Sequence, residues 1–228
     1  RPTTVNYVAL PTLLSSLSVP LSRYIFNTVF TSVAGTIGHL FLASLASYAM
    51  AKIVFPGGRF MFKTVQTSLM FHQTVTAICS FILMSAFRMV DTYWAIIIPA
   101  WGYTLGLYLM KQFMDTNVPD TVLESARLDG ASEIKTFWVI AMPMVKPAWL
   151  TLMILMVQNM WGNPNTTYIY AEKYKTLPAA LSQITSGGLI RAGAGQAVGV
   201  IMLIVPAVIF LINQTKMIET MASSGIKE

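Results

Sequence analysis

The stretch from Thr28 to Ala51 reads TVFTSVAGTIGHLFLASLASYAMA and contains no Asp, Glu, Lys or Arg. A helix needs about 20 predominantly apolar residues to cross the roughly 30 Å hydrocarbon core of a bilayer. This stretch is long enough, and the sequence therefore predicts a membrane-spanning helix over residues 28–51. Such a helix predicts a membrane protein, and further spans are then expected along the chain.

Four more stretches without Asp, Glu, Lys or Arg occur along the chain, at residues 64–87, 92–110, 147–171 and 192–215. Each is long enough to span, with the tilt left undetermined. The prediction is an all-α membrane protein in which residues 1–228 form a single transmembrane domain with five spans. Between the third and fourth spans lies a long charged loop, residues 111–146.

The overall composition supports a bilayer location. Hydrophobic residues make up 55% of the chain and charged residues 11%, whereas a soluble domain carries about 25% charged residues. A chain of this size cannot hide so much apolar surface from water by folding on itself. The same composition excludes a disordered chain and a nucleic-acid-binding domain, and the lone Cys79 excludes an internal disulfide framework.

The distribution of Lys and Arg predicts the orientation. If the segment before Thr28 lies outside, the cytoplasmic side collects the larger share, as the positive-inside rule expects: Lys52, Arg59, Lys63, Lys111, Arg127, Lys135, Lys146, Lys216 and Lys227. The outer side then holds Arg1, Arg23, Arg88, Lys173, Lys175 and Arg191. The C-terminus is then cytoplasmic. Because the chain starts outside without an initiator Met, we expect either that a signal peptide was removed or that an upstream span is absent from this sequence. We favour a further first helix, which makes six spans.

Side chains capable of catalysis are scarce. The predicted spans carry no carboxylate, and His39 and His72 are their only titratable cationic side chains. No metal-ligand spacing and no phosphate-binding Gly-x-x-x-x-Gly-Lys loop occur. We therefore predict that the chain is not an enzyme and holds no metal or cofactor. For the histidines we favour packing with a helix-to-helix hydrogen bond, and the alternative is an intramembrane enzyme using His39 or His72.

The charged loop 111–146 reads as two short helices. Asn117 can cap the first, with Pro119 in its opening turn. Gly130 can end that helix with a positive φ, and Ser132 can cap the next. A short amphipathic helix on the cytoplasmic face is typical of a docking element, and the alternative is a membrane-surface helix without a partner.

The same loop resembles the EAA motif of ABC importer permeases. The segment Glu124-Ser-Ala-Arg-Leu-Asp-Gly-Ala131 is followed by residues at the motif's later positions: Phe137, Ile140, Pro143 and Pro147. Ser125 and Met142 depart from the motif's alanine and leucine. Other segments resemble the sugar-importer branch of this family: residues 23–27, 46–52, 55–57, 174–178 and 224–227. The type that they resemble most is the second maltose permease subunit and its multiple-sugar relatives.

This resemblance implies the fold of a type I ABC importer transmembrane domain in the plasma membrane of a prokaryote. It implies a permease subunit for a sugar or oligosaccharide, with importers of another polar solute as the alternative. The implied partners are a homologous second permease, two ATPase subunits that bind ATP and Mg, and an extracytoplasmic sugar-binding protein. The outer loop 172–191 would meet the binding protein, and the tail 216–228 would lie against the ATPase subunits.

The resemblance also implies site residues. Contact with the ATPase is expected from the EAA residues: Glu124, Ser125, Ala126, Asp129, Gly130, Ala131, Phe137, Ile140 and Pro143. A sugar path needs hydrogen-bonding groups and aromatic faces in the outer half of the spans. The candidates are Gln73, Gln158, Asn159, Trp161 and Asn163. For these polar residues, hydrogen bonding between helices is the alternative, and the partner permease could hold all the sugar contacts.

Overall fold

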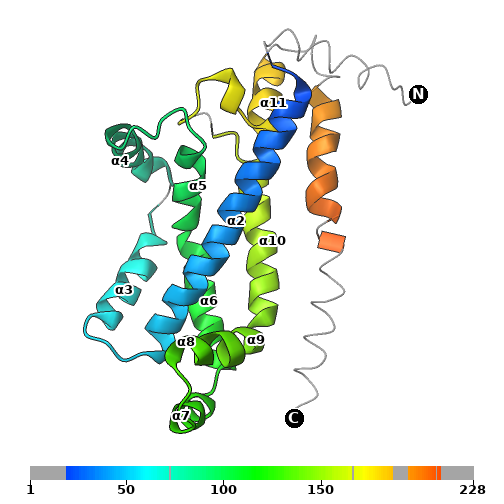
Figure 1. The fold of residues 1–228 in the computed structure, drawn as a ribbon. Coiled ribbons are helices and arrows are strands. Elements are labelled where there is room, and N and C mark those ends of the chain that lie inside the picture. Colours follow the sequence, from blue (N-terminus) through cyan, green and yellow to red (C-terminus); the bar gives the residue numbers. More distant parts are fainter. Residues whose placement is uncertain (1–18, 72, 166, 187–194, 209, 212–228) are drawn as a thin grey trace. The chain divides into compact units, whose positions relative to one another are not determined.

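The computed structural model describes residues 19–71, 73–165, 167–186, 195–208 and 210–211, and every regular element within them is a helix (Figure 1). The chain divides into two compact units. Unit 1 comprises residues 1–36, 77–100 and 156–211, and unit 2 comprises residues 37–76, 101–155 and 212–228. The fold prediction of an all-helical protein is confirmed for the described part.

The longest helix, α2 (Leu21–Lys52), contains the first predicted span. By length and apolar composition, α2 is the one described helix that could cross a membrane alone. The bent pair Glu133–Met144 and Lys146–Gly162 could supply a second crossing. The number of spans thus stays a prediction.

Two predicted spans are interrupted. Residues 64–87 are divided between α3 (Gly58–Ser68) and α4 (Gln73–Ala86). Residues 92–110 are divided between α5 (Trp94–Trp101), which contains Pro99, and α6 (Thr104–Asn117). A search for charge-free residues cannot detect such breaks, because turns inside apolar stretches need no charge.

The remaining helices lie within the charged loop or follow it. They are α7 (Asp120–Leu128), α8 (Glu133–Thr136), the π-helix η1 (Phe137–Ala141), α9 (Met142–Met144), α10 (Lys146–Gly162), the 3₁₀-helix η2 (Glu172–Tyr174) and α11 (Leu177–Ser186). Gly195–Val208 forms a further apolar helix within the predicted span 192–215. The two parts of the bent pair differ in direction by 78°. Pro143 and Pro147 flank this bend, and each lacks the N–H that a continuous helix needs.

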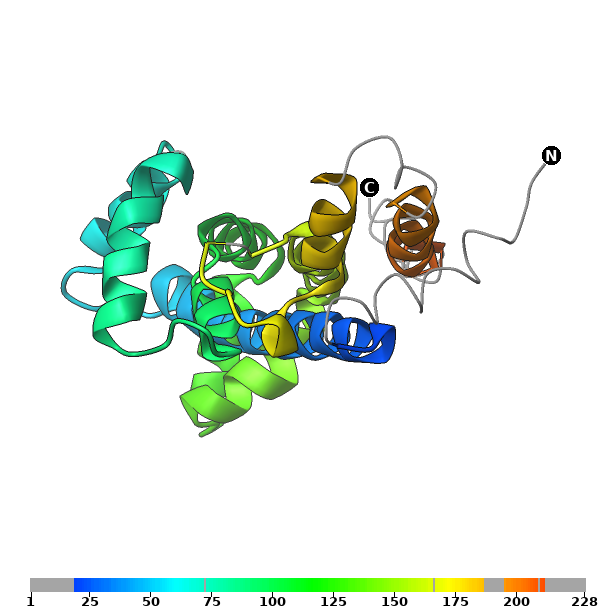
Figure 2. The same ribbon diagram turned by 90° about the horizontal axis from the view of Figure 1, so that it is seen from above.

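Unit 1 has its core between α11 and the helix of residues 195–208, which lie side by side (Figure 2). Tyr24, from the start of α2, is fully buried there with Leu177 and Val198. Gly35 also belongs to this unit, and a Cβ atom there would lie 2.8 Å from Cε of Met160. The unit is therefore packed closely around the first part of α2, residues 21–36.

Unit 2 has its core where α6, α7, η1 and the later part of α2 meet. Its members are Leu40, Tyr48, Met110, Met114, Val118, Leu123, Phe137, Ala141, Val145, Ala148 and Leu152. A Cβ atom on Gly38 would lie 2.0 Å from Nε1 of Trp101, and one on Gly106 would lie 2.1 Å from Nε2 of His39. Glycine thus lets the helix backbones approach these large side chains.

His39 packs inside unit 2, as predicted. Its ring is 1% exposed, and Nδ1 lies 3.1 Å from the carbonyl oxygen of Trp101. The ring also meets Tyr103 edge to face, with 5.7 Å between centroids. These contacts give His39 the packing and hydrogen-bonding role predicted for it. His72 lies outside the described residues.

Candidate functional site

The charged loop places α7 at the end of unit 2, beside α8 (Figure 1). The predicted cap at Asn117 is wrong: α6 continues through Asn117, so its backbone is helical and cannot take the extended conformation of an N-cap. Instead Pro119 precedes the first turn of α7, with no side-chain cap. The predicted cap at Ser132 is confirmed, since its hydroxyl accepts a hydrogen bond from the backbone N–H of Lys135.

The turn after α7 is a left-handed glycine cap, as predicted for Gly130. Gly130 has φ +78°, a conformation that costs other residues about 1 kcal/mol or more. Its N–H donates to the carbonyl of Arg127, and the N–H of Ala131 donates to that of Ala126, at 3.0 Å each. These paired bonds form a Schellman motif, which fixes the direction in which the chain leaves α7.

An ion pair joins the start of α7 to the end of α2. Nζ of Lys52 lies 2.9 Å from Oδ1 of Asp120, and the Lys52 side chain is only 5% exposed while that of Asp120 is 74% exposed. The buried aliphatic part of the Lys52 side chain thus fixes the position of the ammonium group, and the exposed carboxylate of Asp120 pairs with it.

A second ion pair joins the end of α7 to α8 and α2. The guanidinium of Arg127 donates to both carboxylate oxygens of Glu133, at 2.6 and 3.3 Å. The hydroxyl of Tyr48, on α2, donates to the same carboxylate at 3.0 Å. The hydrogen bond from Arg127 holds the pKa of Glu133 below its ordinary value, against the opposing effect of burial. The carboxylate therefore stays ionised at neutral pH and links the end of α7 to α8 and α2.

The two faces of α7 differ. Leu123 and Ala126 are buried, and Leu123 belongs to the core of unit 2. On the other face Glu124 and Asp129 are exposed, and Leu128 is 89% exposed. The exposed face of α7 thus presents Leu128 together with two carboxylates.

The other predicted coupling residues belong to the core that packs against α7, lie within α7, or come after it in the chain. Phe137 is buried and meets Tyr48 edge to face, with 5.2 Å between centroids. Ile140 packs against the same core, whereas Pro143 is exposed. Ala126 is buried within the unit, so its small size serves packing inside this chain. Ser125 donates its hydroxyl to the carbonyl of Thr121, within α7.

The predicted sugar-path residues differ in how exposed their side chains are. Gln158 and Asn159 are exposed near the end of α10. Asn163 is also exposed, and its side-chain oxygen accepts from the backbone N–H of Asn165. Trp161 is 5% exposed, and its indole N–H donates to the carbonyl of Met202 at 2.9 Å. Trp161 thus packs inside unit 1, and the side chain of Gln73 lies outside the described part.

A buried polar junction in unit 1 was not predicted. The amide of Asn27, 0% exposed, donates to the carbonyl oxygens of Lys173 and Lys175, at 2.9 and 2.8 Å. Its oxygen accepts from the hydroxyl of Tyr93 at 2.7 Å. The hydroxyl of Thr28 accepts from the N–H of Leu177 at 2.7 Å. The start of α2 therefore fixes the segment that precedes α11.

Further contacts hold the same segment. The side chain of Asp91 accepts from the N–H groups of Tyr170 and Ala171, at 2.6 and 2.7 Å. The Glu172 carboxylate accepts from Lys175 at 2.6 Å and from Tyr24. Burial favours the neutral acid, but these hydrogen bonds outweigh it and lower the pKa of Glu172. The segment 170–177, called the platform below, is thus held by hydrogen bonds from α2 and Asp91, and no single local motif in the sequence signals it.

A family of known proteins matches most of the chain. The family described as "Binding-protein-dependent transport system inner membrane component" matches residues 41–219. That range includes the whole of the charged loop and both flanking predicted spans.

Individual relatives include sugar permeases. The polygalacturonan/rhamnogalacturonan transport system permease protein YtcP of Bacillus subtilis is 27% identical over 175 residues. That alignment covers 72% of this chain and 59% of YtcP, so the chain spans less than two thirds of that relative. The arabinooligosaccharides transport system permease protein AraQ of Halalkalibacterium halodurans is 29% identical over 210 residues, covering 88% of this chain and 72% of AraQ.

A solved structure has a similar fold. It is a bacterial ABC transporter involved in the import of the acidic polysaccharide alginate, and one of its chains aligns with a TM-score of 0.75 at 21% sequence identity. The alignment covers 85% of this chain and 74% of that one. The likeness shows that the helices are arranged as in an ABC importer.

Proposed function

The chain belongs to the family of binding-protein-dependent transport system inner membrane components, and we propose that it is the permease subunit of an ATP-driven carbohydrate importer. It is a membrane permease component rather than an ATPase. In the proposed importer it forms the translocation path with a homologous second permease. Two ATPase subunits bind and hydrolyse ATP with Mg, and an extracytoplasmic binding protein delivers the sugar.

The geometry of α7 supports the coupling part of this proposal. The helix is fixed by Lys52–Asp120 at its start and by Arg127–Glu133 at its end. Its outward face offers Leu128 between Glu124 and Asp129. A docking helix transmits force only if it moves as one body with the segments behind it. We therefore assign α7 as the contact through which closure of the ATPase subunits moves this permease.

Site-directed crosslinking tests this contact. The only cysteine, Cys79, is exposed and is first replaced by Ser. A cysteine at Leu128 should then crosslink to a co-expressed ATPase subunit in native membranes. Met70, 85% exposed in the break between α3 and α4, provides the matched control position. Equal capture from both positions, or capture from neither, would remove α7 from the coupling role.

The carbohydrate part rests on the relatives and on the exposed amide residues at the end of α10 and directly after it. Gln158, Asn159 and Asn163 present amide groups, which suit sugar hydroxyls because each amide both donates and accepts hydrogen bonds. Trp161 has a different role in this proposal: its indole N–H donates to the carbonyl of Met202 and so fixes the end of α10 next to these amides. Replacing Asn159 by Ala should raise the sugar concentration needed for half-maximal uptake, with assembly unchanged.

The platform 170–177 provides the proposed contact with the binding protein. It is fixed by Asn27 and Asp91, so a docked protein would meet a preformed surface. Tyr170 is 56% exposed on it and is a suitable interface residue. Residues 187–191 of the outer loop and the tail 216–228 lie outside the described residues.

A further inference from the structure

Four aromatic rings form a continuous row within unit 1. Phe26 stacks on Phe30 with 5.9 Å between centroids. Phe30 meets Tyr93 edge to face at 5.2 Å, and Tyr93 meets Tyr174 in the same way at 5.0 Å. The row therefore runs from the first turns of α2 to the platform, which lies at the same end of the unit as the start of α2 (Figure 1).

Two cations lie on this row. Cζ of Arg23 lies 5.7 Å from the centroid of the Phe26 ring, and Nζ of Lys173 lies 4.6 Å from that of the Tyr174 ring. Arg23 also donates to the carbonyl oxygen of Lys173 at 3.5 Å and to the hydroxyl of Tyr93 at 3.3 Å. Because these hydrogen-bond partners are neutral, they orient the guanidinium group without compensating its charge.

The carboxylates of the same region are used by other groups. Glu172 forms an ion pair with Lys175, and Asp91 accepts hydrogen bonds from two backbone N–H groups of the platform. Among the described residues, Arg23 and Lys173 have no carboxylate within ion-pair distance, and both are exposed. The row thus carries two accessible positive charges that attract an anion.

The cation and the apolar side chains of α2 are ordered along the direction in which the helix enters its predicted span. Arg23 precedes residue 28, where the charge-free stretch begins. Phe26 lies about 4.5 Å and Phe30 about 10.5 Å further along the helix axis than Arg23. Phe26, Phe30 and Val33 are 53%, 42% and 50% exposed. Their spacing of four and three residues places them on one face of α2, as an apolar stripe that starts beside the cation and continues into the span.

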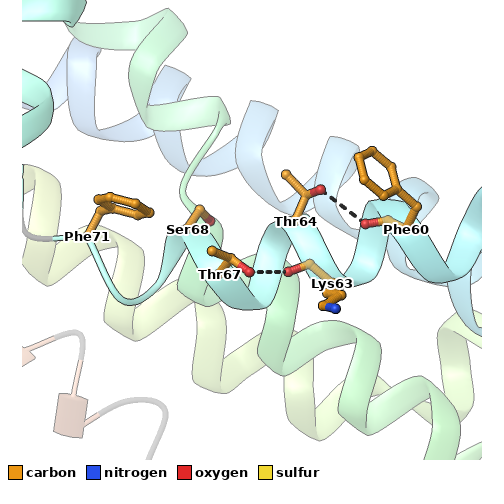
Figure 3. A pocket seen from close by; sticks show the side chains of 6 residues that line it. All are labelled: Phe60, Lys63, Thr64, Thr67, Ser68 and Phe71. Carbon is orange, nitrogen blue, oxygen red and sulfur yellow. Dashed lines mark hydrogen bonds between the residues drawn. The ribbon is translucent and has the colours of Figure 1, made fainter.

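The exposed cations of α3 lack this order. In the part of the chain that the structure describes, Arg59 and Lys63 also have no carboxylate within ion-pair distance. Lys63 lines a pocket of about 390 Å³ together with Phe60, Thr64, Thr67, Ser68 and Phe71. Figure 3 shows the two phenylalanine rings at opposite ends of this lining, with Lys63 between them. A lipid, which has its charge at one end and its chains at the other, does not match such an arrangement.

We infer that the row of rings and cations on unit 1 binds an anionic phospholipid where α2 enters the membrane. The phosphate group lies between Arg23 and Lys173, and an acyl chain lies along Phe26, Phe30 and Val33. Basic and aromatic side chains suit this depth, because the former meet the headgroups and the latter the boundary of the hydrocarbon core.

The two cations predict which lipids are favoured. A phospholipid with a net negative charge offsets part of the positive charge of Arg23 and Lys173. A zwitterionic phospholipid carries the same phosphate, but its ammonium group would be repelled by these side chains. We therefore expect phosphatidylglycerol to be preferred over phosphatidylethanolamine when both have the same acyl chains.

Lipid retention tests this preference. The full chain, with whatever subunits accompany it, is placed in bilayer discs with equal parts of the two lipids and extracted in mild detergent, and mass spectrometry quantifies the lipids that it retains. Lys173→Gln should lower the preference for phosphatidylglycerol about fivefold, and adding Arg23→Gln should lower it about fivefold more. Arg23→Lys combined with Lys173→Arg keeps both charges and should keep the preference.

Arg88→Gln is the matched control. Arg88 is an exposed cation of the same unit on the same predicted side of the membrane, and it has no carboxylate within ion-pair distance in the described ranges. Its replacement should leave the preference nearly unchanged, because no ring or second cation is recorded beside it in those ranges. If Arg88→Gln lowers the preference as much as Lys173→Gln does, the attraction is general and the row is not a site.

Two further results would overturn the inference. One is equal retention of both lipids by the wild-type chain. The other is a lipid ratio unchanged by Lys173→Gln together with weaker association of the extracytoplasmic binding protein, which would assign the two cations to that protein instead. The lipid measurement does not depend on the sugar proposal, since it needs only that α2 lies in a membrane.

Discussion

Asn27 and Lys175, 148 positions apart in the chain, are joined by a hydrogen bond of 2.8 Å from the buried side-chain amide to the backbone carbonyl. The same amide nitrogen donates to the carbonyl of Lys173, so both of its hydrogens are used. Two segments that the sequence shows only as separate family-like motifs thus form one junction. The start of α2 and the platform before α11 should therefore lose their order together.

Replacing Asn27 by Ala leaves two carbonyls without their donor. We expect a loss of about 2 kcal/mol of stability, which lowers Tm by about 4–8 °C. Thermal unfolding in detergent measures it. Asn27→Asp should be as damaging, because a carboxylate cannot donate, while Val29→Ala, at a 43% exposed position of the same helix, should change little. A harmless Asn27→Asp would show that the donated bonds contribute nothing.

Replacing Gly130 by Val should uncouple ATP hydrolysis from sugar uptake while the complex still assembles. A β-branched side chain disfavours φ +78°, so the Schellman turn opens and α7 changes direction. Uptake into vesicles and ATPase activity are measured side by side. Gly57→Val is the control: Gly57 also has a positive φ, +92°, and as at Gly130 nothing lies within 4 Å of an added Cβ. Wild-type sugar uptake in the Gly130→Val variant would contradict the coupling proposal.

The Arg127–Glu133 pair predicts how α7 responds to acid. The pKa of Glu133 is lower in the folded chain than its ordinary value of 4.5. Its contribution is therefore complete above pH 4.5 and is lost as the pH falls through the lowered value. A spin label on a cysteine at Leu128 should become more mobile in that range below pH 4.5.

Glu133→Gln tests the cause. An amide keeps the shape of the side chain but loses its charge, so the label at Leu128 should be mobile at every pH. Tyr48→Phe removes one hydrogen bond to the carboxylate and should shift the transition to a higher pH. If the label in Glu133→Gln is as immobile at pH 7 as in the parent chain, the ion pair does not hold α7.

Gly38→Ala should destabilise the chain by about 1–3 kcal/mol, because the added methyl group would overlap the indole of Trp101 and force it to move. Gly199→Ala is matched to it, since Gly199 lies in a helix and an added Cβ meets nothing within 4 Å. There the substitution should be neutral or stabilising, by about 0.5–1 kcal/mol. Thermal unfolding of both variants in one detergent gives the comparison, and equal losses would refute the packing argument.

Features that depend on nearby residues were predictable. The absence of charge from Thr28 to Ala51 predicts the long helix α2, and Gly130 and Ser132 predict the turn and the cap that follow α7. Each of these depends on residues within one or two helical turns. The wrong cap at Asn117 has the same origin: its local pattern suits a cap, but α6 continues over it.

Features that depend on distant residues were not predictable from one sequence. Nothing near Asn27 indicates Lys173 or Lys175 as partners, and nothing near Tyr48 indicates Glu133. The place of Trp161 near the outer end of a predicted span suggests a sugar contact, but its indole N–H donates to the carbonyl of Met202. The sequence indicates the chemical type of each side chain, but only the fold determines which distant residue it contacts.

The connection between α7 and α8 sets where this protein can be lengthened. Residues 129–132 are bounded by the forked pair Arg127–Glu133, which closes only if the intervening segment keeps its length. A tag or loop inserted there separates the two charges. The connection between α2 and α3 has no such closure, and Val54 within it is fully exposed. An affinity tag placed at residue 54 should leave both units intact, which makes this connection the practical place for purification handles and reporter insertions.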